Sequence, residues 1–203
     1  MKLYVEGGGD TSQLHSLCRQ GFHQFLEKAG FKGRQPRIVA CGGRQQAYDR
    51  FVTACRQSSH EIPMLLVDSE DFVSATSPWV HLVQHDDFSR PNEASDEQGH
   101  LMVVCMESWF LADKDELANY FGRGFNDKAL PGHTDIESIS KNDVYQSILK
   151  ATSQCRTKAP YGKGEHSFAI LGRISPHKVK TASPWAARFL KILDEMTTPT
   201  KKF

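Results

Sequence analysis

Apolar and polar positions follow two alternating patterns along the first 122 residues: short unbroken apolar runs, and longer segments with a period of three to four residues. The apolar runs predict strands at 2–6, 36–43, 62–68 and 101–106, and the unbroken run at 62–68 fits a strand buried on both faces. The periodic segments predict helices at 10–29, 44–58 and 109–122. Such alternation is typical of an α/β fold, in which a mostly parallel sheet is flanked by helices.

The rest of the chain is expected to be loop and helix. Polar, turn-rich composition predicts loops at 72–99 and 123–140, and the helical period returns at 142–154, 166–171 and 183–196. No linker separates these helices from the preceding elements. We therefore expect a core over 1–122 and a helical extension over 123–203 that packs on the same domain.

Composition narrows the class of protein. The five cysteines are odd in number and widely spaced, without a C-x-x-C pair, which favours reduced thiols in a cytoplasm over disulfides or a cysteine zinc site. No apolar run approaches the ~20 residues of a membrane helix, and the N-terminus lacks a signal-peptide pattern. We expect a cytoplasmic protein without a membrane partner.

Charge is distributed unevenly along the chain. Residues 1–60 carry nine Lys and Arg against four Asp and Glu, residues 61–149 five against seventeen, and residues 150–203 eleven against three. An acidic middle between basic ends fits a metal site flanked by a phosphate-binding surface. Solvated faces that cluster by chance would give the same totals.

Carboxylates follow three of the predicted strands. They are Glu6 and Asp10 after the first strand, Asp68 and Glu70 after the third, and Glu107 after the fourth. Parallel strands end at one edge of a sheet, so these side chains should converge there. Clustered carboxylates repel one another unless a cation neutralises them, and oxygen-only ligands suit one or two Mg²⁺ or Mn²⁺ ions. Gly7–Gly9 would let backbone and phosphate approach the metal. Alternatively, Asp10 caps the following helix.

The same residues resemble a Toprim domain, whose marks are a glutamate after the first strand and an Asp-x-Asp after a later one. Here these positions are Glu6, and Asp68 with Glu70; the spacing from Glu6 to Asp10 resembles the overcoming-lysogenization-defect nucleases. The segments "HLMVVCMESWFLAD", "YGKGEHSF" and "ASPWAARF" are similar to small bacterial Toprim-like proteins encoded beside ATPases in defence loci. This resemblance covers residues 1 to about 195.

The resemblance implies roles for individual residues. Glu6 would be a general acid/base or a metal ligand, and Asp68 a metal ligand. Glu70 is one methylene longer than the usual aspartate, so the second ligand is either Glu70 or Asp71. Lys163, between two glycines, would stabilise charge on a leaving oxygen; a solvated turn is the alternative.

Basic residues offer candidate contacts to nucleic-acid phosphates. They are Arg44, Arg173, Lys178 and Lys180, with Arg188 and Lys191 nearby, although each could be ordinary solvated surface. His81 and His85 have the helical spacing of zinc ligands, but no third soft ligand accompanies them. Tyr161 could stack on a base or pack in the core.

Together these features predict a metal-dependent nuclease that acts on DNA or RNA. The resemblance adds anti-phage defence with an AAA- or ABC-type ATPase partner, and the sequence leaves a homo-oligomer open. The alternative is a catalytically inactive Toprim-fold interaction subunit of an ATPase complex. A priming or strand-passage enzyme is a third option, but the 203 residues are few for the additional domains that such enzymes need.

Overall fold

A four-stranded parallel sheet with the strand order β2-β1-β3-β4 lies at the centre of the computed structural model, which describes residues 1–57 and 61–198. The strands are β1 (Lys2–Val5), β2 (Arg37–Ala40), β3 (Pro63–Asp68) and β4 (Gly99–Met102). β1 pairs with β2 and β3, and β3 pairs with β4, all in parallel. The predicted α/β class is therefore confirmed.

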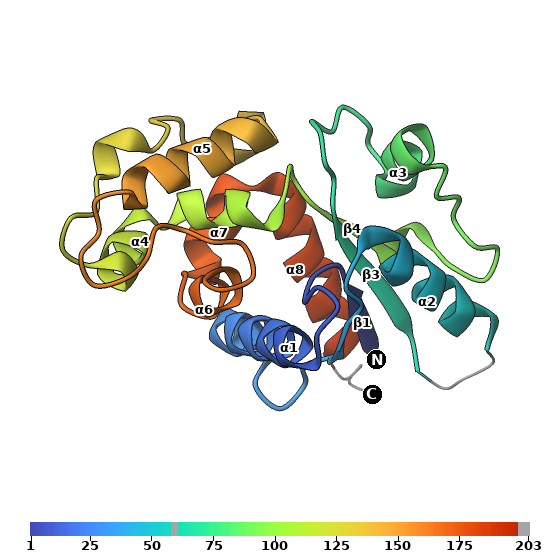
Figure 1. Ribbon diagram of the computed structural model, residues 1–203. Coiled ribbons are helices and arrows are strands. Elements are labelled where there is room, and N and C mark those ends of the chain that lie inside the picture. Colours follow the sequence, from blue (N-terminus) through green and yellow to red (C-terminus); the bar gives the residue numbers. More distant parts are fainter. Residues whose placement is uncertain (58–60, 199–203) are drawn as a thin grey trace.

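Helices cover both faces of this sheet (Figure 1). On one face lie α1 (Ser12–Leu26) and α8 (Pro184–Thr197); on the other lie α2 (Arg44–Arg56) and α3 (Pro78–Asp86). This double cover explains the unbroken apolar run of β3, because Met64–Val67 are completely buried. None of the helices in the described ranges is long and apolar enough to cross a membrane.

The helices after residue 122 pack directly on the elements before it. They follow α4 (Lys114–Phe121), and they are α5 (Lys141–Thr152), α6 (Ser167–Leu171) and α7 (Pro176–Ala182), with α8 last. α6 lies against α1, and α5 lies beside the 3-10 segment Met106–Ala112. Within this packing Trp109 is completely buried and stacks on Phe25, with ring centroids 5.2 Å apart.

The segment 72–99, expected to be a loop, contains α3, so that expectation was wrong. Ser77 caps this helix and Pro78 occupies its first turn. Trp79 and Leu82 are buried, but Val80 and Val83 are exposed, and these two apolar residues on the outer face obscure the helical period.

The fourth strand and the helix after it also differ from expectation. β4 ends at Met102 rather than at residue 106, and the helix expected near Trp109 begins as a 3-10 segment. Residues 103–105 are buried as completely as the strand itself, so the apolar run continues beyond the end of the strand. The loop 123–140 contains two 3-10 turns, Asp127–Ala129 and Ile136–Ser138.

Candidate metal centre

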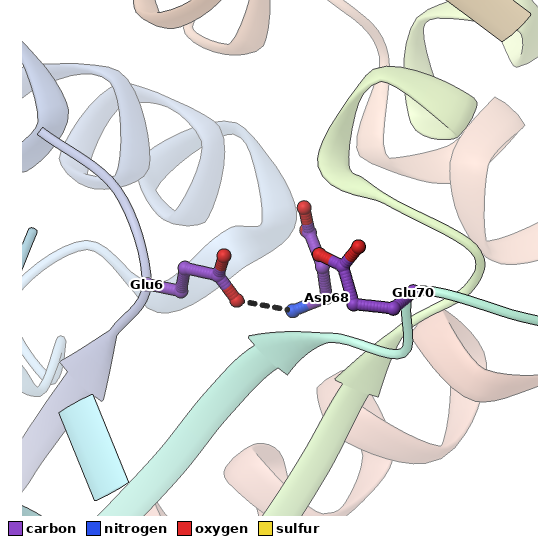
Figure 2. A group of neighbouring side chains, drawn as sticks. All are labelled: Glu6, Asp68 and Glu70. Carbon is purple, nitrogen blue, oxygen red and sulfur yellow. Dashed lines mark hydrogen bonds between the residues drawn. The ribbon is translucent and has the colours of Figure 1, made fainter. Parts of the chain in front are cut away.

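Three of the five predicted metal ligands meet at the carboxyl ends of β1 and β3. Glu6, Asp68 and Glu70 each contribute a carboxylate oxygen, and these oxygens lie within 4.8 Å of one another (Figure 2). β1 and β3 are adjacent parallel strands, so their ends lie side by side. We call Glu6, Asp68 and Glu70 the acidic cluster.

Backbone hydrogen bonds orient two members of the acidic cluster. The N–H of Asp68 donates to Oε2 of Glu6 at 3.1 Å, and the N–H of Met106 donates to Oδ1 of Asp68 at 2.8 Å. Each of these side chains therefore has one oxygen fixed by the backbone and a second oxygen available to a ligand.

Glu70 reaches the acidic cluster through an unusual backbone conformation. Its φ of 67° lies in the left-handed region, and its N–H donates to the carbonyl of Val104 at 2.9 Å. The carboxylate of Glu70 lies beside that of Asp68 (Figure 2). Asp71, the other candidate, instead accepts from the N–H of Phe72 at 2.7 Å. The geometry thus places Glu70, and not Asp71, in the cluster.

Burial and charge repulsion both act on this cluster. Burial raises the pKa of Glu6, and the nearby guanidinium of Arg44 opposes part of that rise. Burial also raises the pKa of Asp68 well above its ordinary value, and the charges of Glu6 and Glu107 raise it further. A bound cation would relieve this strain, and a donor set made only of carboxylate oxygens suits a hard divalent ion.

Lys141, which the sequence did not single out, contacts the acidic cluster from the first residue of α5. Its ammonium lies 2.6 and 2.5 Å from the two carboxylate oxygens of Glu70, and 4.0 Å from Oδ2 of Asp68. Burial alone would lower the pKa of Lys141, but the contacts with Glu70 and Asp68 outweigh it and the pKa is raised. The one sequence signal is a lysine in the first turn of a helix, where the helix dipole disfavours a positive charge.

Glu107 does not join the acidic cluster; it is completely buried and borders the same cavity as Glu6 and Asp68. The hydroxyls of Tyr145 and Tyr161 donate to its two oxygens at 2.9 and 2.8 Å, and that of Ser167 lies 3.4 Å away. These hydroxyls satisfy the carboxylate without a metal ion. Tyr161 is consequently a core residue whose hydroxyl binds Glu107, and its ring does not face a base.

Lys163 and Asp10 line a cavity of about 420 Å³ that opens onto the acidic cluster. The ammonium of Lys163 donates to the hydroxyl of Tyr145 at 2.9 Å, and its charge lowers the pKa of Asp68 in opposition to burial. Asp10 is exposed. It does not cap α1, because Thr11 does so by accepting from the N–H of Leu14. Capping is therefore not the role of Asp10.

The glycines at 7–9 form one part of the wall of this cavity together with Gly42 and Gly43. Gly7 and Gly42 exchange two backbone hydrogen bonds, of 2.8 and 2.9 Å. Gly42 has a φ of 81°, and a Cβ there would lie only 2.9 Å from the carbonyl oxygen of Gly9. Two loops can approach this closely only without side chains. The triple glycine after the first strand thus lets the cavity wall consist of backbone.

Arg44, predicted to bind phosphate, is engaged with the protein itself. Its guanidinium makes two contacts with the carboxylate of Asp86, at the end of α3, including one of 2.9 Å from Nε. It also lies 3.9 Å from Oε2 of Glu6, and only 12% of its side chain is exposed. The structure therefore assigns Arg44 to an ion pair that borders the acidic cluster.

The other predicted phosphate-binding residues lie outside the cavity. Lys178 pairs with Asp113 and Asp115, at 2.7 and 2.9 Å, and Arg173 lies 3.5 Å from Glu116. Lys180 is exposed on α7. Arg188 donates to the carbonyls of Gly99 and Asp96, and Lys191 lies 3.8 Å from Glu195. The structure does not bring these cations to the acidic cluster.

The histidine pair on α3 is bound within the protein. Nε2 of His81 lies 2.8 Å from the carbonyl oxygen of Ser69, and Nδ1 of His85 lies 3.2 Å from Asp86. Within the described ranges, the acidic cluster is the group of three potential ligands close enough to share an ion, and it includes neither histidine. The five cysteines are free thiols.

Comparison with known proteins places the chain in a family. The search of curated proteins and the search of solved structures gave no match. The family profile described as "Domain of unknown function (DUF4276)" matches residues 5–194. The matched range contains the acidic cluster, Lys141 and Lys163. Because the match spans nearly the whole chain, the protein belongs to the DUF4276 family.

Proposed function

We propose that this protein is a metal-dependent nuclease that hydrolyses phosphodiester bonds in DNA or RNA. The observation that carries the proposal is the acidic cluster, three carboxylates from adjacent strand ends with oxygens within 4.8 Å of one another. A cavity of about 420 Å³ adjoins them, within the ~300–1,000 Å³ typical of small-ligand sites. Open parallel sheets commonly bind ligands at this edge. The Toprim resemblance supports the same chemistry.

Glu6, Asp68 and Glu70 would hold a Mg²⁺ or Mn²⁺ ion. Bound there, such an ion would polarise a phosphodiester and activate water for attack on phosphorus. As the alternative to ligating the ion, Glu6 would accept a proton from the attacking water, a role that its raised pKa suits. Its carboxylate is fixed by the Asp68 N–H, so it would need no large movement.

The cavity supplies the remaining groups. Lys163 projects a positive charge at its wall and would stabilise the charge that develops on the leaving oxygen. Tyr145 accepts a hydrogen bond from Lys163 and donates one to the buried Glu107, which positions the lysine. The side-chain-free wall at Gly7–Gly9 would let the sugar-phosphate backbone approach the cluster.

Cleavage of DNA and of tRNA in the presence of Mn²⁺, with and without the neighbouring ATPase, tests the proposal. Wild type should cleave at least one of the two, and Glu6→Gln should lower the rate by about 10²-fold or more, the contribution typical of a general base. Asp71→Asn is the matched control, because it removes a neighbouring carboxylate that lies outside the acidic cluster. Absence of Mn²⁺-dependent cleavage of both substrates under all these conditions would refute the nuclease.

An interaction subunit of an ATPase complex is the second candidate. The contact between Lys141 and Glu70 favours it, because an ammonium already neutralises part of the cluster. Calorimetric titration with Mn²⁺ separates the two candidates. A nuclease should bind the ion and lose binding in Asp68→Ala, whereas an interaction subunit should show no such binding. For either candidate we propose anti-phage defence with an AAA- or ABC-type ATPase as the setting.

A further inference from the structure

We propose that Lys141 sets the metal affinity of the acidic cluster, because its ammonium competes with the divalent ion for the carboxylate of Glu70. This inference rests on the proposed function to the extent that the cluster is a metal site. It assigns Lys141 as a positioning residue that controls when Glu70 is available as a ligand.

The carboxylate of Glu70 is already occupied by the ammonium of Lys141. Both of its carboxylate oxygens contact the Lys141 ammonium, at 2.6 and 2.5 Å. A Mg²⁺ ion binds carboxylate oxygens at about 2.1 Å. An ion ligated by Glu70 would therefore share one small carboxylate with an ammonium group. Two cations at such short range repel each other, so the ammonium and the ion cannot both hold Glu70 in this arrangement.

Lys141 is the partner that can move. The backbone of Glu70 is held by its hydrogen bond to Val104 and by its place directly after β3. The backbone of Lys141 is also held, since Ser140 caps α5, but its side chain is 26% exposed and has four rotatable carbon-carbon bonds. Displacement therefore needs only a change of lysine rotamer.

The position of Lys141 in α5 makes that displacement easier. A positive charge in the first turn of a helix meets the positive end of the helix dipole. The attraction of Glu70, and more weakly of Asp68, is what holds the ammonium against this repulsion. Once an ion neutralises those carboxylates, the helix end favours movement of the ammonium away from the cluster.

The other cations near the cluster are anchored elsewhere. Arg44 is paired with Asp86 and lies 3.9 Å from Glu6 rather than beside Glu70, and the ammonium of Lys163 contacts the hydroxyl of Tyr145. Within the described residues, Glu70 forms its ion pair with Lys141. Competition for Glu70 can therefore be tested at this single lysine.

Calorimetric titration of the full chain with Mn²⁺ tests the inference, using wild type, Lys141→Met, Lys141→Arg and Lys150→Met. Lys141→Met should bind Mn²⁺ at least about tenfold more tightly, a change of about 1.4 kcal/mol. Lys141→Arg keeps a cation beside Glu70 and should not show this gain. Lys150→Met removes the same charge from the exposed far end of α5 and should match wild type.

Lys141→Gln provides a second variant if Lys141→Met does not fold, because an amide can still donate to Glu70 without carrying charge. It should show the same direction of change. Circular dichroism and urea unfolding of each variant verify that the compared proteins are folded. Where cleavage is measurable, the Mn²⁺ concentration for half-maximal rate should fall in parallel with the dissociation constant.

The outcomes separate this inference from the proposed function. If wild type binds Mn²⁺ and removal of the lysine charge leaves affinity unchanged or lowers it, competition is refuted and the metal site stands. If only the charge-removed variants bind, competition is supported and the metal-dependent nuclease is contradicted for the isolated chain. If no variant binds, both are refuted.

Discussion

Asp68→Asn is the substitution that most directly tests whether the acidic cluster is strained by its own charge. Asn has nearly the shape of Asp, and its side-chain oxygen can still accept the N–H of Met106. The change therefore removes one buried negative charge with little effect on packing. We expect the variant to be more stable than wild type when divalent ions are removed with EDTA.

The distances give the size of the effect. Oxygens of Glu6 and Glu70 within 4.8 Å of Asp68 each repel it by about 3 kcal/mol at an effective dielectric of ~20. The ammonium of Lys141, 4.0 Å away, attracts it by about 4 kcal/mol in the same medium. The charges of Glu107 and Lys163 act on Asp68 in opposite directions, and without these two the repulsion exceeds the attraction by about 2 kcal/mol. Weakening of the charged hydrogen bond from Met106 offsets part of this, so we expect a net gain of about 1 kcal/mol.

Thermal unfolding in EDTA measures the effect of the Asp68 charge without metal, and thermal unfolding in excess Mn²⁺ measures the stabilisation by the ion. In EDTA, Asp68→Asn should raise Tm by about 2–4 °C, the shift that 1 kcal/mol produces in a chain of this length. Mn²⁺ at 100 times its dissociation constant should stabilise wild type by about 2.7 kcal/mol and the variant far less. Asp71→Asn, outside the acidic cluster, should behave like wild type.

The pH dependence of stability is a second test of whether the charge on Asp68 destabilises the folded protein. Burial and neighbouring carboxylates raise the pKa of Asp68, so the folded protein binds this proton more tightly than the unfolded chain. The free energy of unfolding of wild type should therefore receive a contribution that declines as pH rises above about 4. The variant should lack it. If Asp68→Asn is less stable than wild type in EDTA, the cluster is not strained and the electrostatic reasoning is refuted.

Two further predictions concern the cavity wall and the core. Gly42→Ala should lower the free energy of unfolding by about 1–3 kcal/mol, because φ at this residue is 81° and the new Cβ would meet the carbonyl oxygen of Gly9. Gly132→Ala is the control, because a Cβ there has no atom within 4 Å and should leave the stability unchanged. Equal urea midpoints for Gly42→Ala and wild type would contradict the prediction. Burial, with the Arg188 charge, lowers the pKa of His100 to about 3, so between pH 7 and pH 5 the unfolded chain binds a proton that the folded state does not. Between pH 7 and pH 5 the free energy of unfolding, measured with urea, should fall by about 2 kcal/mol more for wild type than for His100→Gln. An equal fall for the two proteins would contradict the prediction.

Two members of the acidic cluster could be predicted because strand position determines where they lie. Glu6 and Asp68 stand at the ends of two apolar runs, and parallel pairing brings those ends together whatever the loops do. The choice between Glu70 and Asp71 could not be predicted in the same way. It depends on the left-handed backbone of Glu70, which a non-glycine residue adopts only when surrounding contacts impose it.

The surroundings of two site residues differ from those expected because the fold differs there. Arg44 resembled a free phosphate ligand because its partner, Asp86, lay in a segment predicted to be a loop, whereas it ends α3. Glu107 resembled a metal ligand because β4 was expected to reach residue 106. The strand ends at Met102, and the 3-10 segment that follows places Glu107 against Tyr145 and Tyr161.

The places of Lys141 and Tyr145 at the site could not be predicted from the sequence, for a different reason. Both lie on α5, whose place in the molecule is decided by packing against the 3-10 segment Met106–Ala112. Lys141 is 71 residues from Glu70 in the sequence, and no spacing rule connects them. Helical periodicity predicts that α5 exists, but it does not predict which elements the helix contacts.

The acids and the cations of the candidate site come from different parts of the chain. The strand ends of the first 70 residues carry the three acids, whereas Lys141 and Lys163, which neutralise their surroundings, come from beyond residue 122. Without nearby cations, the three ionised carboxylates would repel one another strongly in this partly buried site. The chain after residue 122 therefore does more than cover the sheet, because Lys141 on α5 and Lys163 in the turn before α6 add their charges to that of Arg44 beside the carboxylate cluster. A functional site assembled this way depends on the docking of α5 as strictly as on the pairing of β1 with β3.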